Sequence, residues 1–192
     1  MKIEQSQLIN DLIALSQQVL ATTKTFKHLP YEALNFKPDH NTWSILECIE
    51  HLNRYGRFYL PEIEDQLLKS TPISKDRIFR SGFLGTYFVK LVRADNPKKM
   101  KAPREMDTTG STLKSNVIDQ FVKQLETLII LMDQSKTANL NTIKTAISLT
   151  RFVRLRLGDT LRFLVHHNER HINQAKRVMD KLEVDETFTQ ST

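Results

Sequence analysis

The chain has 192 residues, of which 40% are apolar and 26% charged, enough for one sizeable hydrophobic core. No stretch approaches the roughly 20 consecutive apolar residues that a membrane-spanning helix needs. The first residues, MKIEQSQLIND, are polar where a signal peptide would be apolar. We therefore expect one domain over residues 1–183, a flexible C-terminal tail over residues 184–192, and a cytoplasmic location.

The formal net charge of +6 raises the question of an acidic partner. One basic run lies in a proline-containing segment that is typical of a solvated loop. The second basic run lacks the interleaved aromatic residues on which nucleic-acid bases would stack. The two runs consist of Lys90, Arg93, Lys98, Lys99, Lys101 and Arg104, and of Arg151, Arg154, Arg156 and Arg162. This pattern disfavours nucleic-acid binding and favours a basic rim that steers anionic small molecules toward a pocket.

Helical periodicity begins near the amino terminus and predicts a first helix over residues 4–26. A connector rich in turn-forming residues follows, YEALNFKPDHNTW. The second helix is predicted to begin at Ser44, because Ser44 and Glu47 form a Ser-x-x-Glu capping box before an apolar stripe. Pro61 lies inside the continuation of this helix, where we expect a kink.

The second half of the chain continues the helical pattern. A short apolar helix is expected over residues 82–92, and a long polar connection over 96–115 is of the kind that often folds over a site. The third long helix is predicted over 115–135, and the fourth from Asp159 or Thr160 to about Leu182. No alternating apolar run is long enough to predict a sheet. The fold class is therefore all-α, a four-helix bundle with long connections and a site between facing inner stripes.

Two histidines on the last predicted helix, His167 and His171, are candidate metal ligands. A four-residue step turns a side chain by only about 40° around a helix axis, so both imidazoles lie on the apolar stripe that includes Leu164 and Val178. His51, on the second helix, lies at the edge of another apolar face. Together these residues would make a three-nitrogen set with open coordination positions.

Spacing alone leaves two interpretations of these histidines open. They form a metal site, or they are histidines satisfied by hydrogen bonds in the core or at the surface. Two buried neutral imidazoles side by side would disfavour each other's protonation, and a metal would use both lone pairs. The single cysteine, Cys48, lies within a predicted helix, where a small buried side chain is the simplest interpretation.

Two segments carry a resemblance to a known family. WSILECIEHL and LGDTLRFLVHHNERHINQAKRV resemble the tryptophan-serine motif with its helical histidine, and the last-helix histidine pair, of the DinB-like superfamily. The resemblance covers most of the chain and implies a four-helix bundle, commonly a homodimer, with a divalent metal held by three histidines. Carried over to this sequence, the ligands are His51, His167 and His171.

The same resemblance bears on the neighbouring residues. The doublet His166-His167 leaves a question of register, which the four-residue spacing to His171 decides in favour of His167. Trp43 matches a family position, with simple aromatic packing as the alternative. Gln174 follows one turn after His171 and is placed to hydrogen-bond into the site or to end its polar patch. Residues 168–170 are expected to face solvent or a partner subunit.

Members that resemble this chain include thiol-dependent transferases, thiol-dependent isomerases and hydrolases. The resemblance therefore suggests a metal-dependent enzyme that activates a low-molecular-weight thiol for transfer to an electrophile. Hydrolysis by metal-bound water is the enzymatic alternative, and Glu47 is the only carboxylate in helical register to assist it. A non-catalytic stress protein that binds a metal or ligand is the third hypothesis. Three imidazoles accept several ions, with zinc and nickel the first expectation.

Overall fold

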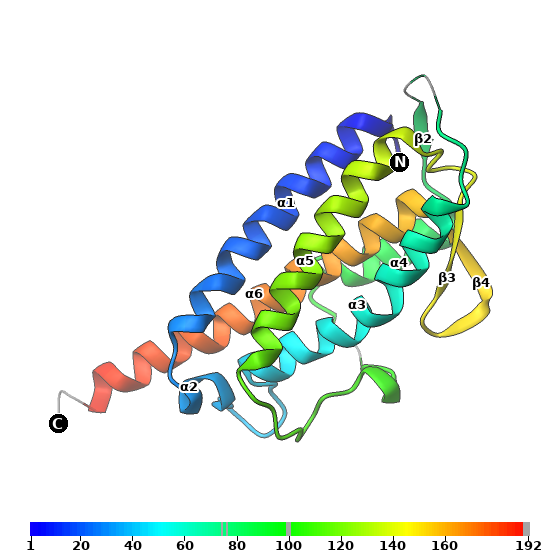
Figure 1. Cartoon of the computed structure of the whole chain (residues 1–192). Helices are drawn as coiled ribbons and strands as arrows, with labels where there is room; N and C mark the ends of the chain where they lie inside the picture. Colours follow the sequence, from blue (N-terminus) through cyan, green and yellow to red (C-terminus); the bar gives the residue numbers. More distant parts are fainter. Residues whose placement is uncertain (74, 76, 99–100, 190–192) are drawn as a thin grey trace.

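Four long helices form a bundle in the computed structural model of the chain, two of them running in one direction and two in the opposite direction (Figure 1). The structure describes residues 1–73, 75, 77–98 and 101–189, without the side chains of 151 and 183–189. The bundle helices are α1 (Gln5–Thr25), α3 (Ile45–Leu68), α5 (Asn116–Gln134) and α6 (Leu157–Thr189). Helix α3 packs against α5 and α6, and α1 packs against the same two helices. The predicted all-α four-helix bundle is confirmed.

Helix α3 begins where its capping box predicts. The hydroxyl of Ser44 accepts a hydrogen bond from the backbone N–H of Glu47 at 3.2 Å, and Glu47 Oε2 accepts one from the backbone N–H of Ser44 at 2.9 Å. Two N–H groups that the first helical turn leaves unpaired are satisfied in this way. The helix then runs without interruption through Pro61, so no new segment begins at that residue.

The interior is divided into two apolar clusters along the bundle. One includes Tyr55, Tyr59 and Leu164, and the other includes Cys48, Leu52 and Ile172. On α3, His51 lies between Cys48 and Tyr55. On α6, the two candidate histidines lie between Leu164 and Ile172. The histidines therefore occupy the junction of the two clusters.

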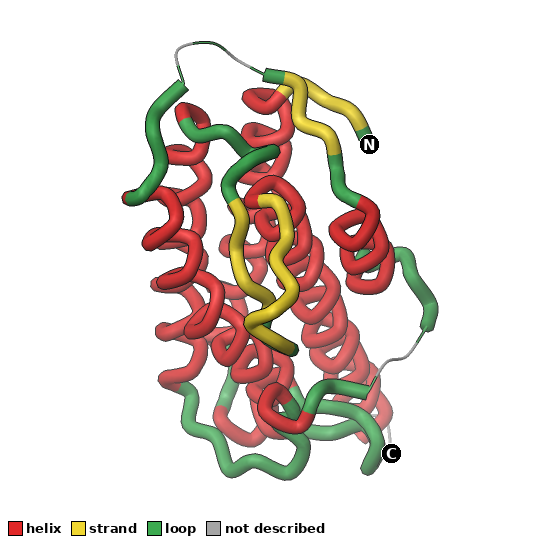
Figure 2. Tube along the Cα trace, turned by 90° about the vertical axis from the view of Figure 1, so that its right-hand side faces the viewer, coloured by secondary structure: helices red, strands yellow, loops and turns green. Residues whose placement is uncertain are grey.

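Shorter elements complete the chain. Helix α4 (Phe83–Val92) matches the short helix expected over 82–92, and it packs on α6. Short helical segments occur in the connections: η1 (Phe26–His28), α2 (Tyr31–Asn35), η2 (Arg104–Met106) and η3 (Ser135–Thr137). Strand β1 (Lys2–Glu4) pairs antiparallel with β2 (Ile78–Arg80), and β3 (Lys144–Ile147) pairs antiparallel with β4 (Thr150–Arg156). Figure 2 shows the β3–β4 hairpin in front of the bundle helices and the β1–β2 pair near the amino terminus.

The β3–β4 hairpin was not expected from the sequence. Its second strand coincides with the basic run at 151–156, where Leu155 is buried while Phe152 and Arg154 are exposed. This is the two-residue alternation of a half-buried strand. The run is short, and its exposed side carries arginines, so its apolar content is too low to predict a strand. The expectation that no sheet would form was wrong for these two small pairs.

Helix α6 is longer at both ends than predicted. It begins at Leu157, so Gly158 lies in its first turn rather than before it. A side chain at Gly158 would collide with the ring of Phe79, which explains the need for glycine there. The helix continues to Thr189, past the expected end near Leu182. Part of the predicted flexible tail, residues 190–192, lies outside the described residues, and the flexibility of the tail stays a prediction.

None of the helices in the described ranges combines the length and apolar character needed to span a bilayer.

We expect Ser44→Ala to lower the free energy of unfolding by about 1 kcal/mol, because it removes the side-chain cap of α3. Ser115→Ala is the matched control, since Ser115 occupies the same position before α5 without capping it through its side chain. Chemical denaturation of both variants measures the difference. Equal effects of the two substitutions would contradict the role of the cap.

Candidate metal centre

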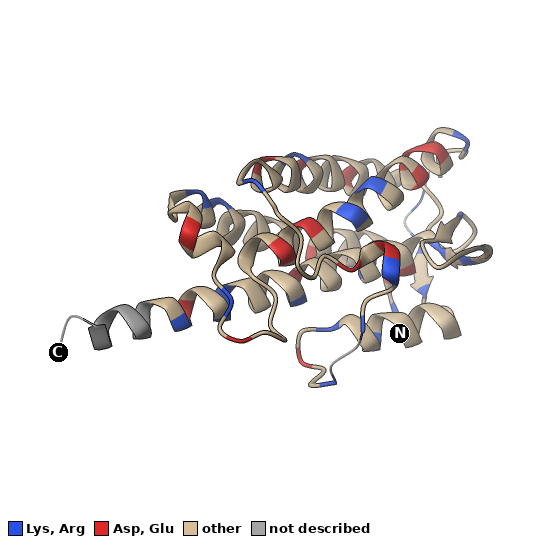
Figure 3. Cartoon of the chain, turned by 90° about the horizontal axis from the view of Figure 1, so that it is seen from below, with Lys and Arg blue, Asp and Glu red and all other residues tan. Residues whose placement is uncertain are grey.

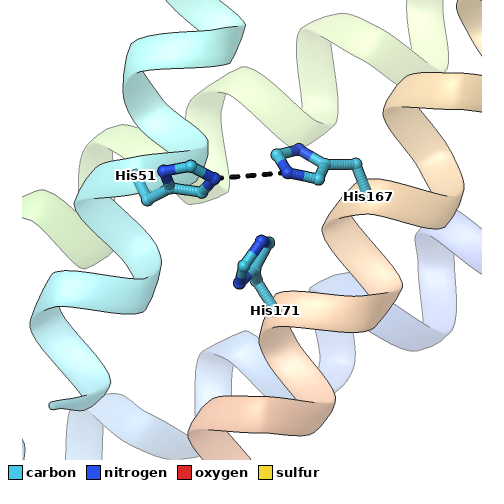
Figure 4. Close-up of side chains that lie close together, drawn as sticks. All are labelled: His51, His167 and His171. Atoms are coloured by element: carbon cyan, nitrogen blue, oxygen red, sulfur yellow. Dashed lines mark hydrogen bonds between the residues drawn. The ribbon is translucent and has the colours of Figure 1, made fainter. Parts of the chain in front are cut away.

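Helices α3 and α6 bring three imidazoles together inside the bundle. His51 projects from α3, and His167 and His171 project from consecutive turns of α6 (Figure 4). One ring nitrogen of each residue lies within 4.8 Å of the others, and the Nε2 atoms of His51 and His167 are 3.2 Å apart. His51 and His167 are buried, and His171 is partly buried. The three candidates from the sequence are thus neighbours in space.

Hydrogen bonds outside the cluster set the tautomers of two of these rings. The Nδ1–H of His51 donates to the carbonyl oxygen of Met106 at 2.6 Å. The Nδ1–H of His171 donates to Oε1 of Gln174 at 3.0 Å. Each ring therefore keeps its Nε2 lone pair for a ligand, which is the arrangement that outer hydrogen bonds produce in metal-binding histidines. The hydrogen bond suggested for Gln174 is present.

His167 is held differently. Its ring stacks on Phe163 with centroids 5.5 Å apart and lies 4.4 Å from the ring of Tyr55. Its Nδ1 atom is buried and has no hydrogen-bond partner among the described residues. Such an atom carries a desolvation cost. Packing, rather than an outer hydrogen bond, orients this third imidazole.

Burial keeps all three imidazoles neutral. Desolvation lowers the pKa of His51 to about 4, against the upward effect of its bond to Met106. The pKa values of His167 and His171 lie well below the usual range, first because of burial and then because of repulsion from the neighbouring histidines. Neutral imidazoles with lone pairs directed at a common space suit a divalent cation such as zinc or nickel. The donor set therefore fits the implied metal.

The long connection between α4 and α5 folds over this cluster, as expected for residues 96–115. Met106 from this connection accepts the bond from His51, and Thr109 Oγ1 accepts one from Trp43 Nε1 at 2.8 Å. The Trp43 ring lies 4.8 Å from the ring of His51 and 5.7 Å from that of His171. Trp43 therefore packs directly against two candidate ligands.

Glu47, the carboxylate considered for proton transfer, is fully engaged elsewhere. It is 1% exposed and accepts hydrogen bonds from Lys37 Nζ and the backbone N–H of Gly110, both at 2.6 Å. It also accepts the bond from the backbone of Ser44. The side chain thus anchors the start of α3 and the overlying connection, which leaves it unsuited to act as a general base.

Three other residues considered from the sequence, Cys48, His166 and Asn168, lie outside the histidine cluster. Cys48 is completely buried, and burial raises the pKa of its thiol well above the usual range, so it is an inert core residue. His166 points away from the cluster and pairs with Glu169 at 3.1 Å. Asn168 is buried, which corrects the expectation that it faces solvent or a partner. Helix α6 contacts α1, α3 and α4, so residues on more than one of its faces are buried.

Arg170 has a positioning role that the sequence did not reveal. Its guanidinium donates to the backbone carbonyls of Arg93, Asn96 and Lys98 at 2.7–2.9 Å. These bonds tie the segment after α4 to α6 beside the histidines. Any residue type can provide a backbone carbonyl, so the sequence contains no signal for this contact.

A cavity of about 890 Å³ opens onto the three histidines. Helices α3, α4 and α6 contribute to its walls, together with the β3–β4 hairpin and the connection after α4. A metal held by only three protein nitrogens at this position would have coordination positions facing the cavity. Figure 3 shows Lys and Arg positions spread over several elements, with Asp and Glu positions among them.

Comparisons with known proteins identify a family for the chain. The sequence profile of the DinB superfamily matches residues 14–175. The chain is 25% identical over 171 residues to the uncharacterized protein YuaE of Bacillus subtilis (strain 168), a match that covers 85% of this chain and 94% of the relative. No solved structure matches the chain significantly.

We predict that His167→Ala and His171→Ala each abolish stoichiometric binding of zinc or nickel, because each removes one of three inward nitrogens. His166→Ala is the matched control and should keep its metal, since its ring bonds to Glu169 outside the cluster. Bound metal per chain, measured on untagged protein, tests the assignment. Full loading of His171→Ala, or loss in His166→Ala alone, would show that the ligands are misassigned.

We also predict that the metal-free protein loses stability as the pH falls from about 6.5 toward 4. The pKa of His51 is about 4 in the folded chain and about 6.5 in an unfolded one, so the unfolded chain binds more protons in this window. That difference corresponds to about 3 kcal/mol for His51 at the low end. Denaturation in the presence of a chelator should show a shallower decline for His51→Gln, and identical declines would count against burial of the neutral ring.

Proposed function

Because the chain belongs to the DinB superfamily, we propose that it is a metal-dependent enzyme that transfers a low-molecular-weight thiol to a carbon electrophile. The observation that carries the proposal is a set of three neutral imidazoles at the wall of an open cavity. A divalent cation bound there would supply a Lewis acid that lowers the pKa of a thiol beside it. Zinc and nickel are the ions we expect. A cytoplasmic location, where thiols are kept reduced, belongs to the same proposal.

In the proposed reaction the thiol loses its proton to solvent, and its sulfur forms a new bond to the electrophilic carbon. The bond from that carbon to the leaving group breaks, and the leaving group departs with the electron pair. The protein contributes binding and orientation. Outer hydrogen bonds from His51 and His171 hold the imidazole rings in place. The rings of Trp43, Tyr55 and Phe163 pack against the imidazoles of His51 and His167.

Thiol transfer is favoured over the two alternatives by specific contacts. Hydrolysis by metal-bound water is assisted by a nearby base, and Glu47, the carboxylate considered for this role, is occupied by Lys37, Ser44 and Gly110. A non-catalytic metal-binding protein would be expected to saturate its ion with protein ligands, whereas the three histidines here face a cavity of about 890 Å³. The cavity also has basic lining residues, which suit an anionic thiol.

We predict that metal-loaded protein conjugates a carboxylate-bearing thiol to an alkyl or aryl halide, and that His171→Ala reduces the rate to background. Removal of the metal with a chelator should have the same effect, and readdition should restore the rate. Release of halide and loss of free thiol, followed together, should occur in equal amounts. Halide release or ester hydrolysis at full rate without any thiol would reverse the assignment to a hydrolase.

We further propose a homodimer, on the basis of the family resemblance and the frequency of two-fold assemblies. Light scattering at micromolar concentration should then give about twice the chain mass of 22.4 kDa. A mass equal to that of one chain would refute the dimer without affecting the proposed chemistry, because all three histidines come from one chain.

A further inference from the structure

The cavity extends along α6 on both sides of the histidines. The lining residues that α6 contributes follow one another along the helix: Phe163, His167, Arg170, His171, Gln174, Arg177, Val178 and Lys181. A helix rises by about 1.5 Å per residue. Phe163 therefore lies about 6 Å along the axis on one side of His167, and Arg177 lies about 9 Å beyond His171 on the other side. The histidines separate two ends of one cavity.

The end toward Phe163 is apolar and aromatic. The ring of Phe163 lies 6.0 Å from that of Tyr55, 5.7 Å from that of Tyr59 and 6.5 Å from that of Phe88. The hydroxyl of Tyr59 accepts a hydrogen bond from the backbone N–H of Ser148, so its polar tip is engaged. The remaining lining residues from α4 and the hairpin are uncharged: Leu91, Val92, Ile147, Leu149 and Leu155. A charged ligand group would be desolvated here without a partner.

The end beyond His171 is polar and cationic. Gln174, Arg177 and Lys181 line it. Helical side chains lean toward the amino terminus, so Arg177 reaches back toward the histidines. Among residues whose side chains the structure describes, no acidic group forms an ion pair with Arg177.

We infer that the two ends bind different substrates, an inference that rests on the proposed thiol transfer. The electrophile is an uncharged alkyl or aryl compound that occupies the end formed by α4, the hairpin and Phe163. The thiol cosubstrate lies toward Arg177, which receives its carboxylate. The two reacting atoms then meet at the histidines, where the S–C bond forms, the thiol proton goes to solvent and the leaving group departs with its electron pair.

The apolar end can be tested alone with the uncharged dye N-phenyl-1-naphthylamine and metal-free protein. Leu91→Gln should weaken dye binding about tenfold, because a polar amide replaces a half-buried lining side chain. Leu84→Gln is the matched control on the same helix, since Leu84 is outside the cavity lining. Dye fluorescence gives the affinities, and thermal unfolding checks that both variants fold. Absence of saturable binding, or equal weakening in Leu84→Gln, would overturn the assignment of this end.

The orientation can be tested by displacement of the dye with S-hexylglutathione, a thioether that carries both an alkyl chain and carboxylates. Arg177→Gln should weaken its binding about fivefold, as for loss of one exposed ion pair, and leave the dye affinity unchanged. Lys176→Gln removes the same charge from an exposed neighbour outside the lining and should change neither affinity. The binding of S-methylglutathione should also be weakened by Arg177→Gln. This compound should displace the dye poorly, because it lacks the alkyl chain that would occupy the apolar end.

Equal effects of Arg177→Gln and Lys176→Gln, or failure of S-hexylglutathione to displace the dye, would overturn the orientation. These measurements need neither metal nor turnover, so they separate the two proposals. If the dye and displacement measurements give the expected results but the activity assay shows no thiol transfer, the binding assignment stands and the proposed reaction is refuted. If thiol transfer occurs but dye binding does not depend on Leu91, the reaction stands and the assignment of the apolar end is refuted.

Discussion

Burial of three imidazoles between α3 and α6 is the constraint on which the rest of the site depends. The interior on either side of them is apolar, so the charged form of each ring is strongly disfavoured, and each pKa is lowered. Neutral imidazoles still carry one N–H and one lone pair that need partners. The surrounding structure supplies acceptors for His51 and His171 outside the cluster, which leaves their lone pairs directed inward. The outer hydrogen bonds thus allow imidazoles in an apolar interface to serve as candidate metal ligands.

The same constraint explains why an irregular segment is tightly fixed. The connection before α5 provides the carbonyl of Met106 to His51, and it can do so only if its own backbone is held in place. Glu47 and Thr108 hold it, because the Glu47 carboxylate accepts from Gly110 and its backbone carbonyl accepts from Thr108 at 2.9 Å. Glu47, the second member of the capping box, thereby links the start of α3 to the connection that provides the hydrogen-bond acceptor for His51. A residue that looked like a candidate base is instead part of the support.

The histidine cluster and the cavity have separate roles in the proposed chemistry. The cluster provides a ligand set that the superfamily resemblance alone already implies, whereas the cavity walls differ from one end to the other. Aromatic residues and the hairpin form one end, and basic residues of α6 form the other. In the proposed reaction, a metal ion held between an apolar and a basic end would suit two substrates of unlike polarity. Hydrolysis of a single substrate has no need of such an arrangement.

Local patterns in the sequence determined much of the helical framework. The capping box at Ser44 marked the start of α3, and the four-residue spacing of His167 and His171 placed both on one inward face, because helix geometry depends only on neighbours in the chain. The neutral state of the rings, the engagement of Glu47 and the burial of Asn168 depended on residues far away in sequence, and only the packed bundle decided them. The same holds for Arg170, whose partners are backbone carbonyls that any residue could provide. The hairpin was also missed, because its short strands become half-buried only through their contacts with α3 and α6, which lie far away in sequence or are decided by the packing.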